Sequence, residues 1–487
     1  MSQRARGPRV LVIGAGFGGI AVAALLRRAG FDNLLILEKA DRAGGVWRDN
    51  TYPGCACDIP ASLYSYSFAP NPDWSCRFPP RAEIRAYLDR CIADFGLTEA
   101  LRPDTEVTEA RWDDAGRRWL VRTAAGEELT ADVLVPAVGQ LSRPVTPHLP
   151  GADRFHGTAM HTARWDPTVR IDGARVGVIG TGASAIQVVP AIAGRAARVT
   201  VFQRSAPWAL PKPNRRYGPV RRTAYRRAPA LMSVSRGGIW ALTVLTGLAV
   251  TGNRSAHALL RGVATAQLRW QVPDPRLRAR LAPADPLGCR RVLFTSDWYP
   301  TLRRSDVDLV TEPVREITPT GVCTMDGVEH RCDVLVYATG FAATDFLAPI
   351  TVVGREGRKL ADVWQGGPYA YLGMTVPGFP NLFLVYGPNT NTGNTSVIYF
   401  QEAQARYIVQ AVRHLAAGRG PLEVRAEVAG DYDTELQRRL AGSVWTACRS
   451  WYRDPAGRIV TNWPGMAGEY RRRTAHLRLA DFAEDLS

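Results

Sequence analysis

The chain has 487 residues, too many for one hydrophobic core, so its length predicts two or three domains. Hydrophobic residues make up 46% and charged residues 22%, a composition that excludes an intrinsically disordered protein. The net charge of +16 is compatible with nucleic acid or a membrane surface. Because the arginines are spread along the chain without a dominant block, we expect no nucleic-acid partner.

The eight cysteines indicate a reducing compartment. They include Cys55, Cys57 and Cys289, contain no Cys-x-x-Cys pair and lack the density of a small secreted framework. The first residues, Met-Ser-Gln-Arg-Ala-Arg-Gly-Pro, have no apolar segment of the kind found in signal peptides. We therefore expect a cytoplasmic protein, and we predict no metal site.

The first glycine-rich motif follows an apolar run near the N-terminus. Residues 9–13 are typical of a buried parallel strand, a helix is predicted over 20–28, and a second strand over 33–38 ends at Glu38. Three glycines stand between the first strand and the helix: Gly14, Gly16 and Gly19. This order predicts a dinucleotide site with the pyrophosphate at the helix N-terminus and Glu38 on a ribose hydroxyl.

A second glycine-rich block covers residues 44–58 and reads Gly-Gly-Val-Trp-Arg-Asp-Asn-Thr-Tyr-Pro-Gly-Cys-Ala-Cys-Asp. Its candidate cofactor-binding residues are Gly45, Trp47 and Asp58. The block is also compatible with a glycine-rich loop around one buried tryptophan.

Two nearly identical segments occur about 200 residues apart. Residues 132–140 read Asp-Val-Leu-Val-Pro-Ala-Val-Gly-Gln, and residues 333–341 read Asp-Val-Leu-Val-Tyr-Ala-Thr-Gly-Phe. Such a pair indicates two related nucleotide-binding modules, each closed by a strand that meets its cofactor near a glycine turn. The candidate residues are Gln140 in the first copy and Thr339 and Gly340 in the second.

The segment 155–166 reads Phe-His-Gly-Thr-Ala-Met-His-Thr-Ala-Arg-Trp-Asp. It fits Phe-x-Gly-x-x-x-His-x-x-x-Trp-Pro/Asp and so resembles the fingerprint of type I Baeyer–Villiger monooxygenases. The fingerprint residues are Phe155, Gly157, His161 and Trp165. The block 44–58 is similar to a second signature of that family, which lines FAD and has an aspartate at the position of Asp58. The alternative is a linker whose two aromatic residues pack between domains around a core histidine.

The second module repeats the first. An apolar strand over 174–179 is followed by Gly180 and Gly182, and the next strand ends at Arg204. Arg204 lies 24 residues beyond Gly180, as Glu38 lies 24 beyond Gly14. A guanidinium suits a 2′-phosphate where a carboxylate suits a ribose hydroxyl, so we interpret the first module as FAD-binding and the second as NADPH-binding. Further candidates are Ser184, Gln187 and Ser205; the alternative for Arg204 is an exposed arginine at a strand end.

Residues 211–286 are the least informative part. They carry arginine pairs and an apolar, helix-like run over 237–252, which is shorter than the ~20 residues that a membrane-spanning helix needs. We favour a helical insertion that covers the substrate pocket, and a weakly associating membrane-surface helix is the alternative.

Residues 286–300 resemble a family segment in which two basic residues precede a tyrosine. By position Arg291 matches the family's catalytic arginine and Arg290 a residue that reaches the NADPH phosphate. Many family members have lysine at the position of Arg290. Arginine keeps the positive charge of lysine, but its side chain differs in reach and in hydrogen-bonding geometry. Both could also be solvated charges at a strand start.

The chain then returns to the flavin domain. Residues 381–386 are predicted to form a strand that leads into a polar loop with Asn389, followed by a helix over 397–412. In two-domain flavoproteins such a loop lies beside the isoalloxazine ring. The aromatic C-terminal region is similar to that of 4-hydroxyacetophenone-type monooxygenases.

The resemblance covers nearly the whole chain and implies an α/β fold with two Rossmann-like dinucleotide-binding domains. The expected division is 1–150 for the first part of the FAD domain, 151–330 for the NADPH domain with the insertion, and 331–487 for the second part of the FAD domain. The expected partner is a small lipophilic ketone, and the chain is expected to be a monomer or homodimer.

The resemblance also implies a mechanism. NADPH reduces FAD, the reduced flavin captures O2 as a C4a-peroxide, and attack on a ketone gives an ester or lactone. Arg291 would supply a fixed cation, and Asp58 would orient it. The runner-up is oxygenation of N or S, as in the related flavin-containing monooxygenases, whose linker ends in Tyr or Phe where this chain has Trp165. A non-enzymatic basic protein that binds membranes or nucleic acid is a third possibility.

Overall fold

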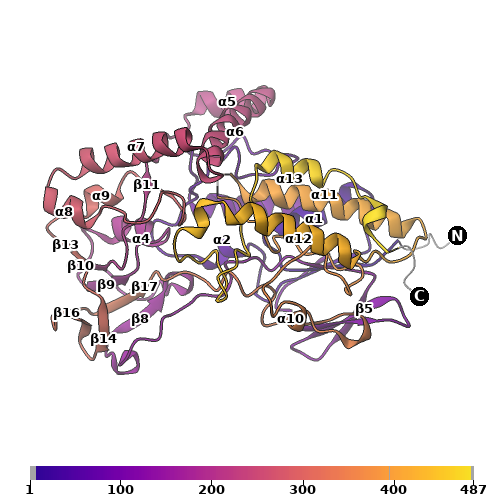
Figure 1. The fold of residues 1–487 in the computed structure, drawn as a ribbon. Coiled ribbons are helices and arrows are strands. Elements are labelled where there is room, and N and C mark those ends of the chain that lie inside the picture. The colour runs from indigo at the N-terminus through magenta and orange to yellow at the C-terminus, as the bar shows by residue number, and fades with distance from the viewer. Residues whose placement is uncertain (1–6, 394, 484–487) are drawn as a thin grey trace.

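The computed structural model describes residues 7–393 and 395–483. Two parallel sheets with helices beside them lie next to each other (Figure 1). Both ends of the chain contribute to the first unit, and the middle of the chain forms the second. The architecture is the predicted α/β fold with two Rossmann-like units.

The first parallel sheet has the strand order β3-β2-β1-β7. Its strands are β1 (Val10–Ile13), β2 (Leu34–Leu37), β3 (Leu101–Arg102) and β7 (Val133–Pro136). β1 lies in the middle, with Val10 opposite both Leu34 and Val133, and all four of its residues are buried. A strand covered on both faces needs apolar residues throughout, which explains its unbroken apolar run.

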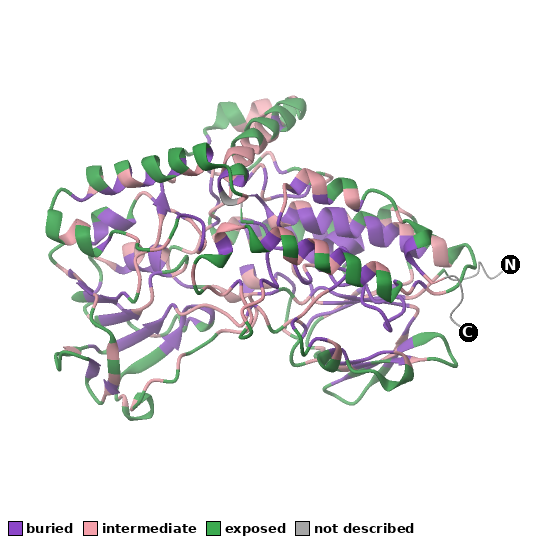
Figure 2. Ribbon diagram, in the orientation of Figure 1, coloured by how far each residue is buried: buried purple, intermediate pink, exposed green. Residues whose placement is uncertain are grey.

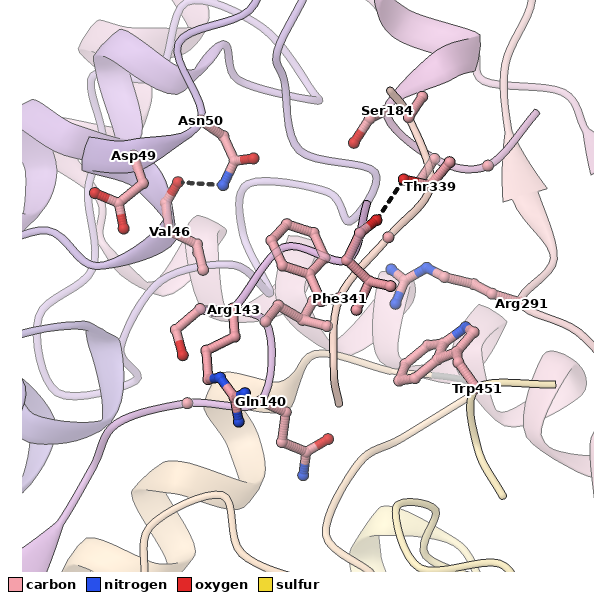
Figure 3. Close-up of a pocket in the computed structure, with 18 of the residues that line it drawn as sticks. Val46, Asp49, Asn50, Gln140, Arg143, Ser184, Arg291, Thr339, Phe341 and Trp451 are labelled. Atoms are coloured by element: carbon pink, nitrogen blue, oxygen red, sulfur yellow. Dashed lines mark hydrogen bonds between the residues drawn. The ribbon is translucent and has the colours of Figure 1, made fainter. Parts of the chain in front are cut away.

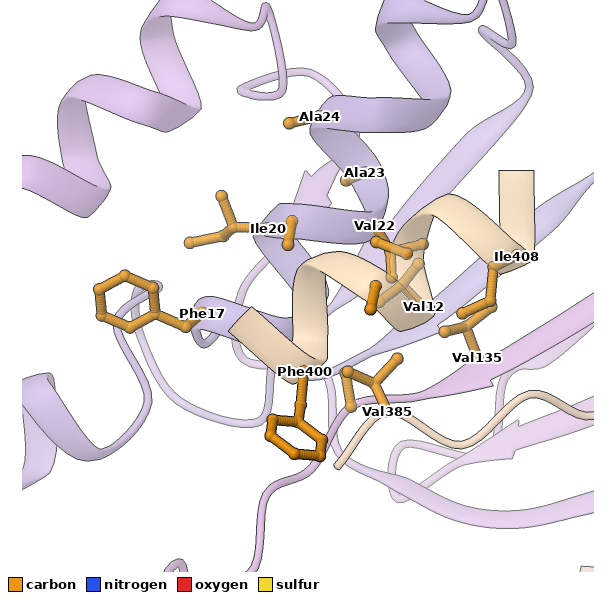
Figure 4. Packing of buried hydrophobic residues seen from close by; sticks show 14 of the residues in the cluster. Val12, Phe17, Ile20, Val22, Ala23, Ala24, Val135, Val385, Phe400 and Ile408 are labelled. Atoms are coloured by element: carbon orange, nitrogen blue, oxygen red, sulfur yellow. The ribbon is translucent and has the colours of Figure 1, made fainter. Parts of the chain in front are cut away.

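Helices from both ends of the chain cover this sheet. They are α1 (Phe17–Arg28), α3 (Arg81–Asp94), α11 (Val397–Ala416), α12 (Ala426–Ala441) and α13 (Ala467–Arg473). Ile20 of α1 and Phe400 and Ile408 of α11 share one core with Val12 and Val135 of the strands (Figure 4). Each such side chain stabilises the fold by about 1.5–3 kcal/mol when fully buried.

The second parallel sheet has the order β13-β10-β9-β17-β8. Its strands are β8 (Thr158–His161), β9 (Arg175–Ile179), β10 (Arg198–Phe202), β13 (Val307–Val310) and β17 (Val334–Tyr337). The helices α4 (Ala185–Ile192) and α9 (Trp298–Thr301) pack against each other in the same core. Because β17 pairs with β8 and β9, the second unit extends past the expected boundary at residue 330.

Each unit also carries a smaller sheet built on antiparallel strands that come just before its last parallel strand. In the first unit the order is β18-β4-β5-β6, with β18 added parallel to β4 from later in the chain, and in the second it is β14-β15-β16. The strands are β4 (Val107–Asp113), β5 (Arg118–Thr123), β6 (Glu128–Ala131), β14 (Val314–Thr318), β15 (Gly321–Thr324), β16 (Glu329–Arg331) and β18 (Thr351–Val353). The segment 381–386, predicted as a strand, is not a regular strand: it runs along β7 through an isolated bridge between Leu382 and Leu134, and the backbone N–H of Val385 donates to the carbonyl oxygen of Pro136 at 2.9 Å.

The insertion is helical, as expected, and its base is closed by β11 (Ala209–Leu210) paired with β12 (Leu293–Phe294). Its helices are α5 (Pro219–Arg227), α6 (Ala230–Val250), α7 (Arg254–Gln271) and α8 (Pro275–Arg280). α6 starts seven residues before the apolar run and has 21 residues. The apolar run is therefore part of a helix that is long enough to cross a membrane, contrary to the prediction.

The remaining elements are short. They are the helices α2 (Val46–Asp49) and α10 (Leu360–Val363) and the 3-10 helices η1 (Ala152–Arg154), η2 (Thr162–Arg164), η3 (Arg355–Gly357), η4 (Val444–Thr446) and η5 (Leu479–Asp481).

Candidate active site

A cavity of about 990 Å³ lies between the two units. The last residues of four parallel strands line it: Ile13, Leu37, Ile179 and Phe202. Both sheets therefore turn their carboxyl ends toward it, which is where open α/β sheets bind ligands. Side chains from both units surround this space (Figure 3).

Most of the candidate residues from the sequence line this cavity. They are Gly14, Gly16, Glu38, Gly45, Trp47, Asp58, Gln140, Gly180, Gly182, Ser184, Gln187, Arg204, Ser205, Arg290, Arg291, Thr339 and Gly340. Six candidates do not line it: Gly19, Asn389 and the four fingerprint residues Phe155, Gly157, His161 and Trp165.

Gly19 and Asn389 instead support the cavity wall. A Cβ at Gly19 would collide with the carbonyl oxygen of Gly14, so Gly19 lets helix α1 pack behind the turn. Asn389 is buried, and its side-chain amide donates to the carbonyl oxygens of Ile459 at 2.9 Å and Asn462 at 3.0 Å. Its predicted place beside a cofactor is not supported, and it ties the polar loop to the C-terminal region.

The first glycine turn exposes backbone N–H groups at the N-terminus of α1. Gly14 has φ +102°, and a Cβ there would lie 2.7 Å from the carbonyl oxygen of Ala137, so only glycine fits. Gly45 has φ +52°, and its Cβ would lie 3.2 Å from the Cα of Gly16. The two glycine loops therefore meet, and unobstructed backbone at a helix N-terminus favours a phosphate.

Glu38 is 4% exposed, and its carboxylate already has three partners. It accepts from the backbone N–H of Ala15 at 3.0 Å and of Ala40 at 3.1 Å, and it pairs with Arg48 at 2.9 Å. A carboxylate can accept about four hydrogen bonds, so one position remains for a hydroxyl group. Glu38 thus fixes the glycine turn and can also bind a ribose.

The second glycine turn has the same geometry. Gly180 has φ +113°, and a Cβ there would lie 2.5 Å from the carbonyl oxygen of Ala338. At Gly182 a Cβ would meet nothing within 4 Å, so that position tolerates a side chain when the site is empty.

Two arginines of the second unit, Arg204 and Arg290, line the cavity near Ser205. Arg204 is exposed, and it has no ion-pair partner among the described residues. Arg290 donates to the hydroxyl oxygen of Ser205 and pairs with Asp285 at 3.1 Å. A free guanidinium beside a second one is suited to a phosphate monoester.

Arg291 and Asp58 meet inside the cavity although 233 residues separate them. Arg291 Nη2 donates to Asp58 Oδ2 at 2.7 Å. Burial raises the pKa of the Asp58 carboxyl, but the charge and hydrogen bond of Arg291 together with the charge of Lys212 outweigh burial, so this pKa lies below its ordinary value of 3.8. The charge of Asp58 in turn raises the pKa of Arg291. Both groups are therefore ionised at neutral pH.

Known proteins show the same organisation. The pyridine nucleotide-disulphide oxidoreductase family matches residues 11–227. A Baeyer–Villiger monooxygenase from Streptomyces coelicolor is 42% identical over 97% of this chain and 92% of that protein. Another from Pseudomonas aeruginosa is 40% identical over 96% of this chain and 90% of that protein. The chain belongs to the Baeyer–Villiger monooxygenases.

Solved structures extend the comparison to the fold. A structure of oxidized steroid monooxygenase bound to NADP has a TM-score of 0.85 and 33% identity, and the match covers 96% of this chain and 97% of that one. A closed structure of cyclohexanone monooxygenase has a TM-score of 0.84 and 32% identity over 96% of both chains. The chain is an NADPH-dependent flavoprotein monooxygenase, as predicted.

The residues fit the two cofactors of a Baeyer–Villiger monooxygenase. In the first unit the bare glycine turn and the open position on Glu38 fit the pyrophosphate and ribose of FAD. In the second unit the turn at Gly180 and the unpaired Arg204 fit NADP.

The family fingerprint forms the edge strand β8 and the turn after it. Gly157 leaves no room for a Cβ against the carbonyl oxygen of Asp333. His161 Nδ1 accepts from the backbone N–H of Ala163 at 3.0 Å, and burial lowers the pKa of this imidazole, so it is neutral at pH 7. Its ring contacts Phe341, which lines the cavity, with 5.8 Å between ring centroids. The fingerprint thus contacts the site through its wall.

Gln187 joins the two units. Its Oε1 accepts from the hydroxyl of Tyr52 at 2.9 Å and its Nε2 donates to the carbonyl oxygen of Ala56 at 2.9 Å. A Cβ at Gly54 would lie 2.5 Å from the carbonyl oxygen of Gln187, so the loop from the first unit approaches α4 closely. Gln187 was predicted to bind a cofactor; its amide is already used in this interdomain contact.

Two other candidates, Gln140 and Thr339, form hydrogen bonds in the segments through which the chain passes from one unit to the other. Gln140 Nε2 donates to the carbonyl oxygen of Tyr386 at 3.1 Å. Thr339 Oγ1 donates to the carbonyl oxygen of Val145 at 2.5 Å, and Val145 N donates to Gly340 O at 2.9 Å. In the first unit, Trp47 Nε1 donates to Tyr64 Oη at 3.0 Å.

Sequence reasoning missed the aromatic residues around Arg291. Trp451 and Tyr386 line the cavity, and Figure 3 shows Trp451 near Arg291. Burial raises the pKa of Tyr452 to about 12, although the charge of Arg291 acts against this rise. The aromatic pair at 451–452 was visible in the sequence, but no spacing rule placed it here.

A disulfide joins Cys289 to Cys448, with 6.1 Å between their Cα atoms. It ties the segment that carries Arg291 to the segment that carries Trp451. The sequence did not predict this bond, because the two cysteines are 159 residues apart and no local pattern relates them.

Proposed function

We propose that the chain oxygenates a small lipophilic ketone to an ester or lactone in the part of the cavity beside Arg291. The observation that supports this is the Arg291–Asp58 ion pair, with one partner from each unit, in a cavity bordered by both glycine turns. The pair brings a fixed positive charge to the place where the two cofactor sites converge.

When bound, NADPH and FAD supply the hydride and the activation of O2. Arg291 would then stabilise negative charge on oxygen as the carbonyl is attacked, because a preorganised cation costs no reorganisation during the step. Asp58 fixes the direction of the guanidinium through its hydrogen bond. Phe341 and Trp451 add apolar surface that accepts a ketone and limits water.

Replacement of Arg291 by alanine tests this proposal. We expect Arg291→Ala to retain FAD and to consume NADPH, but to release hydrogen peroxide and form at least a hundredfold less ester. Loss of a preorganised electrostatic group costs about 2.7–4 kcal/mol in the step that it serves. Mass spectrometry of the product and a peroxide assay measure the two outcomes separately.

The control is Arg175→Ala, which removes an arginine of the same unit that pairs with Asp333 at 2.6 Å outside the cavity. This variant should form ester at the parent rate. Ester formation by Arg291→Ala at the parent rate would show that the assigned role is wrong. A substrate panel that includes thioethers and amines tests the runner-up, oxygenation of S or N.

We further propose that the chain works in the cytoplasm as a monomer or homodimer. Six of the eight cysteines are free, which supports a reducing compartment, whereas the Cys289–Cys448 disulfide is unusual for one. One chain supplies the residues on both sides of the cavity, so a second copy is not needed to complete it.

A further inference from the structure

The helices α5, α6 and α7 form an arm: α5 and α6 project from the body of the protein, and α7 runs along the outside of the second unit (Figure 1). Most of the arm's surface is exposed or only partly buried (Figure 2). Among the described residues, none between 209 and 284 lines the cavity. The expectation that the insertion covers the substrate pocket is therefore not supported, and the arm needs another explanation.

α6 has one face on the body and an apolar face toward solvent. On the inner face Arg236 donates to the carbonyl oxygens of Ser62 at 2.9 Å and Ser65 at 3.0 Å, and Trp240 packs on Tyr399 with 4.6 Å between ring centroids. Exposed apolar residues follow the outer face at helical spacing: Leu231, Val234, Leu242 and Leu248. α6 is thus an amphipathic helix with its apolar stripe on the outside.

The neighbouring helices continue this apolar surface. Val220 of α5 is 82% exposed, and Trp270 of α7 is 80% exposed, with Leu259 and Val263 exposed on the same helix. Twelve large hydrophobic residues are exposed in the described chain, and eight of them lie between residues 220 and 270. Such a concentration marks an interaction surface, because scattered exposed apolar residues would be distributed over the whole chain.

The arm is also strongly basic. Residues 211–273 contain ten arginines and one lysine but no aspartate or glutamate, so they carry +11 of the net charge of +16, and the expectation that the positive charge has no dominant block is wrong. On α7, Arg254, Arg261 and Arg269 are exposed and form no ion pair within the part of the chain that the structure describes. The arm therefore carries both exposed apolar residues and free cations.

These features select one partner. A second copy would bring the same positive charge against the arm, and a nucleic acid would not cover an apolar stripe. By length and composition α6 is the one helix in the described ranges that could cross a membrane. Arg236 and Trp240 attach one side of α6 to the body of the protein. Because that side contacts protein, lipid cannot surround the helix as it would surround a membrane-spanning helix. We propose that the arm docks on an anionic phospholipid bilayer, with α6 and α7 lying in the plane of the interface.

The arm is attached at the wall of the cavity. Its flanking residues Trp208 and Asp285 both line the cavity, and Trp208 Nε1 donates to the carbonyl oxygen of Asp285 at 2.7 Å. Docking would place this wall close to the bilayer, where lipophilic molecules concentrate. This consequence rests on the proposed ketone substrate, whereas docking itself does not.

Co-sedimentation of the FAD-loaded protein with vesicles tests the proposal. Vesicles of phosphatidylglycerol and phosphatidylcholine should bind the protein, and vesicles of phosphatidylcholine alone should bind it at least tenfold more weakly. The triple variant Arg254→Ser, Arg261→Ser and Arg269→Ser should lose affinity about a hundredfold, since each basic residue near an anionic surface contributes about fivefold. The triple variant Leu231→Ser, Val234→Ser and Leu242→Ser should also lose binding, at any salt concentration.

Two control variants match these changes outside the arm. Arg413→Ser, Arg419→Ser and Arg438→Ser remove three exposed charges, and Met325→Ser, Val328→Ser and Leu479→Ser remove exposed apolar surface. Both should bind vesicles like the parent protein. FAD content and the thermal unfolding midpoint establish that every variant is folded, and ester formation in detergent-free buffer tests the oxygenase function independently of docking.

Three outcomes would overturn the proposal. Equal binding to neutral vesicles would remove the role of the arginines. A dimer, seen by light scattering, that dissociates in the Leu231, Val234 and Leu242 variant without any vesicle binding would identify a second copy as the partner. Binding to duplex DNA that survives loss of the apolar stripe, in the absence of vesicle binding, would identify a nucleic acid.

Discussion

The two Rossmann-like units have the same backbone arrangement, including equivalent individual hydrogen bonds. In the first unit the backbone N–H of Arg9 donates to Asp132 Oδ2 at 2.6 Å, and in the second that of Arg175 donates to Asp333 Oδ2 at 2.8 Å. Each first glycine, at 14 and 180, faces the carbonyl oxygen of an alanine that follows the last strand. The repeated Asp-Val-Leu-Val segments therefore mark a repeated structure.

The units differ in what surrounds this common plan. Glu38 is buried and paired with Arg48, whereas Arg204 at the corresponding position is exposed and free. α1 has 12 residues packed against α11, while α4 has 8 residues and contains Pro190. The first site is part of the protein core, which suits a cofactor that stays bound. The second site is open, which suits a cofactor that exchanges at every turnover.

The largest expected contrast concerns stability. Glu38→Ala should destabilise the protein by about 3–5 kcal/mol, because it leaves a buried arginine without its partner. The destabilisation should lie near the lower end of this range, because Arg48 keeps a second ion pair, with Asp49 at 2.8 Å. Arg204→Ala should change stability by no more than about 0.5 kcal/mol. Thermal and urea unfolding of the FAD-loaded protein compare the two variants, and equal destabilisation would contradict the proposed difference between the sites.

The second prediction concerns cofactor preference. Arg204→Ala should reduce the preference for NADPH over NADH by about 1.5–3 kcal/mol, the value of a hydrogen bond to a charged group. The control is Arg198→Ala at the start of β10, the strand that precedes Arg204, and it removes an arginine paired with Asp308 outside the cavity. Steady-state kinetics with both cofactors measure kcat/KM. An unchanged ratio in Arg204→Ala would refute the phosphate contact.

The third prediction separates the two turns. Gly14→Ala and Gly180→Ala should each strain the backbone by about 1–3 kcal/mol, because alanine is disfavoured at positive φ and its Cβ would meet a carbonyl oxygen. Gly14→Ala should lose FAD, whereas Gly180→Ala should stay yellow and be reduced slowly by NADPH. Gly182→Ala, whose Cβ meets no atom within 4 Å, is the control for the unloaded fold. Flavin absorbance and stopped-flow reduction distinguish these results, and FAD loss in Gly180→Ala would show that the units are not independent.

Much of the fold was predictable because its signals are local. An unbroken apolar run indicates a strand buried on both faces, and glycines with positive φ follow it wherever the chain must turn tightly into a helix. The strands ending at Ile13, Leu37 and Ile179 and the helix α11 were expected near their observed positions. The Arg291–Asp58 contact was expected only from the resemblance to the family, since no local pattern relates residues 233 apart.

The misses come from contacts that the sequence does not encode locally. Asn389 looked like a cofactor residue because it lies in a polar loop, but its partners come from the C-terminal region. α6 extends beyond its apolar run because Ala230–Arg236 is helical without being uniformly apolar. The second unit was predicted to end at residue 330, but it also includes β17, which pairs with β9. Strand pairing, and not position in the chain, decides to which sheet a strand belongs. The likeness of the C-terminal region to 4-hydroxyacetophenone-type enzymes stays a prediction.

The packing of α1 against α11 has a consequence for synthesis on the ribosome. The first unit lacks the α11 part of its core until residue 416 has emerged and the α13 part until residue 473, whereas all five strands of the second parallel sheet are available by residue 337. At about 5–20 residues per second, the N-terminal part waits roughly ten to fifty seconds for α11 after its own last strand has been made. The second unit, in the middle of the chain, can thus fold before the first unit, although N-terminal domains usually fold first during synthesis.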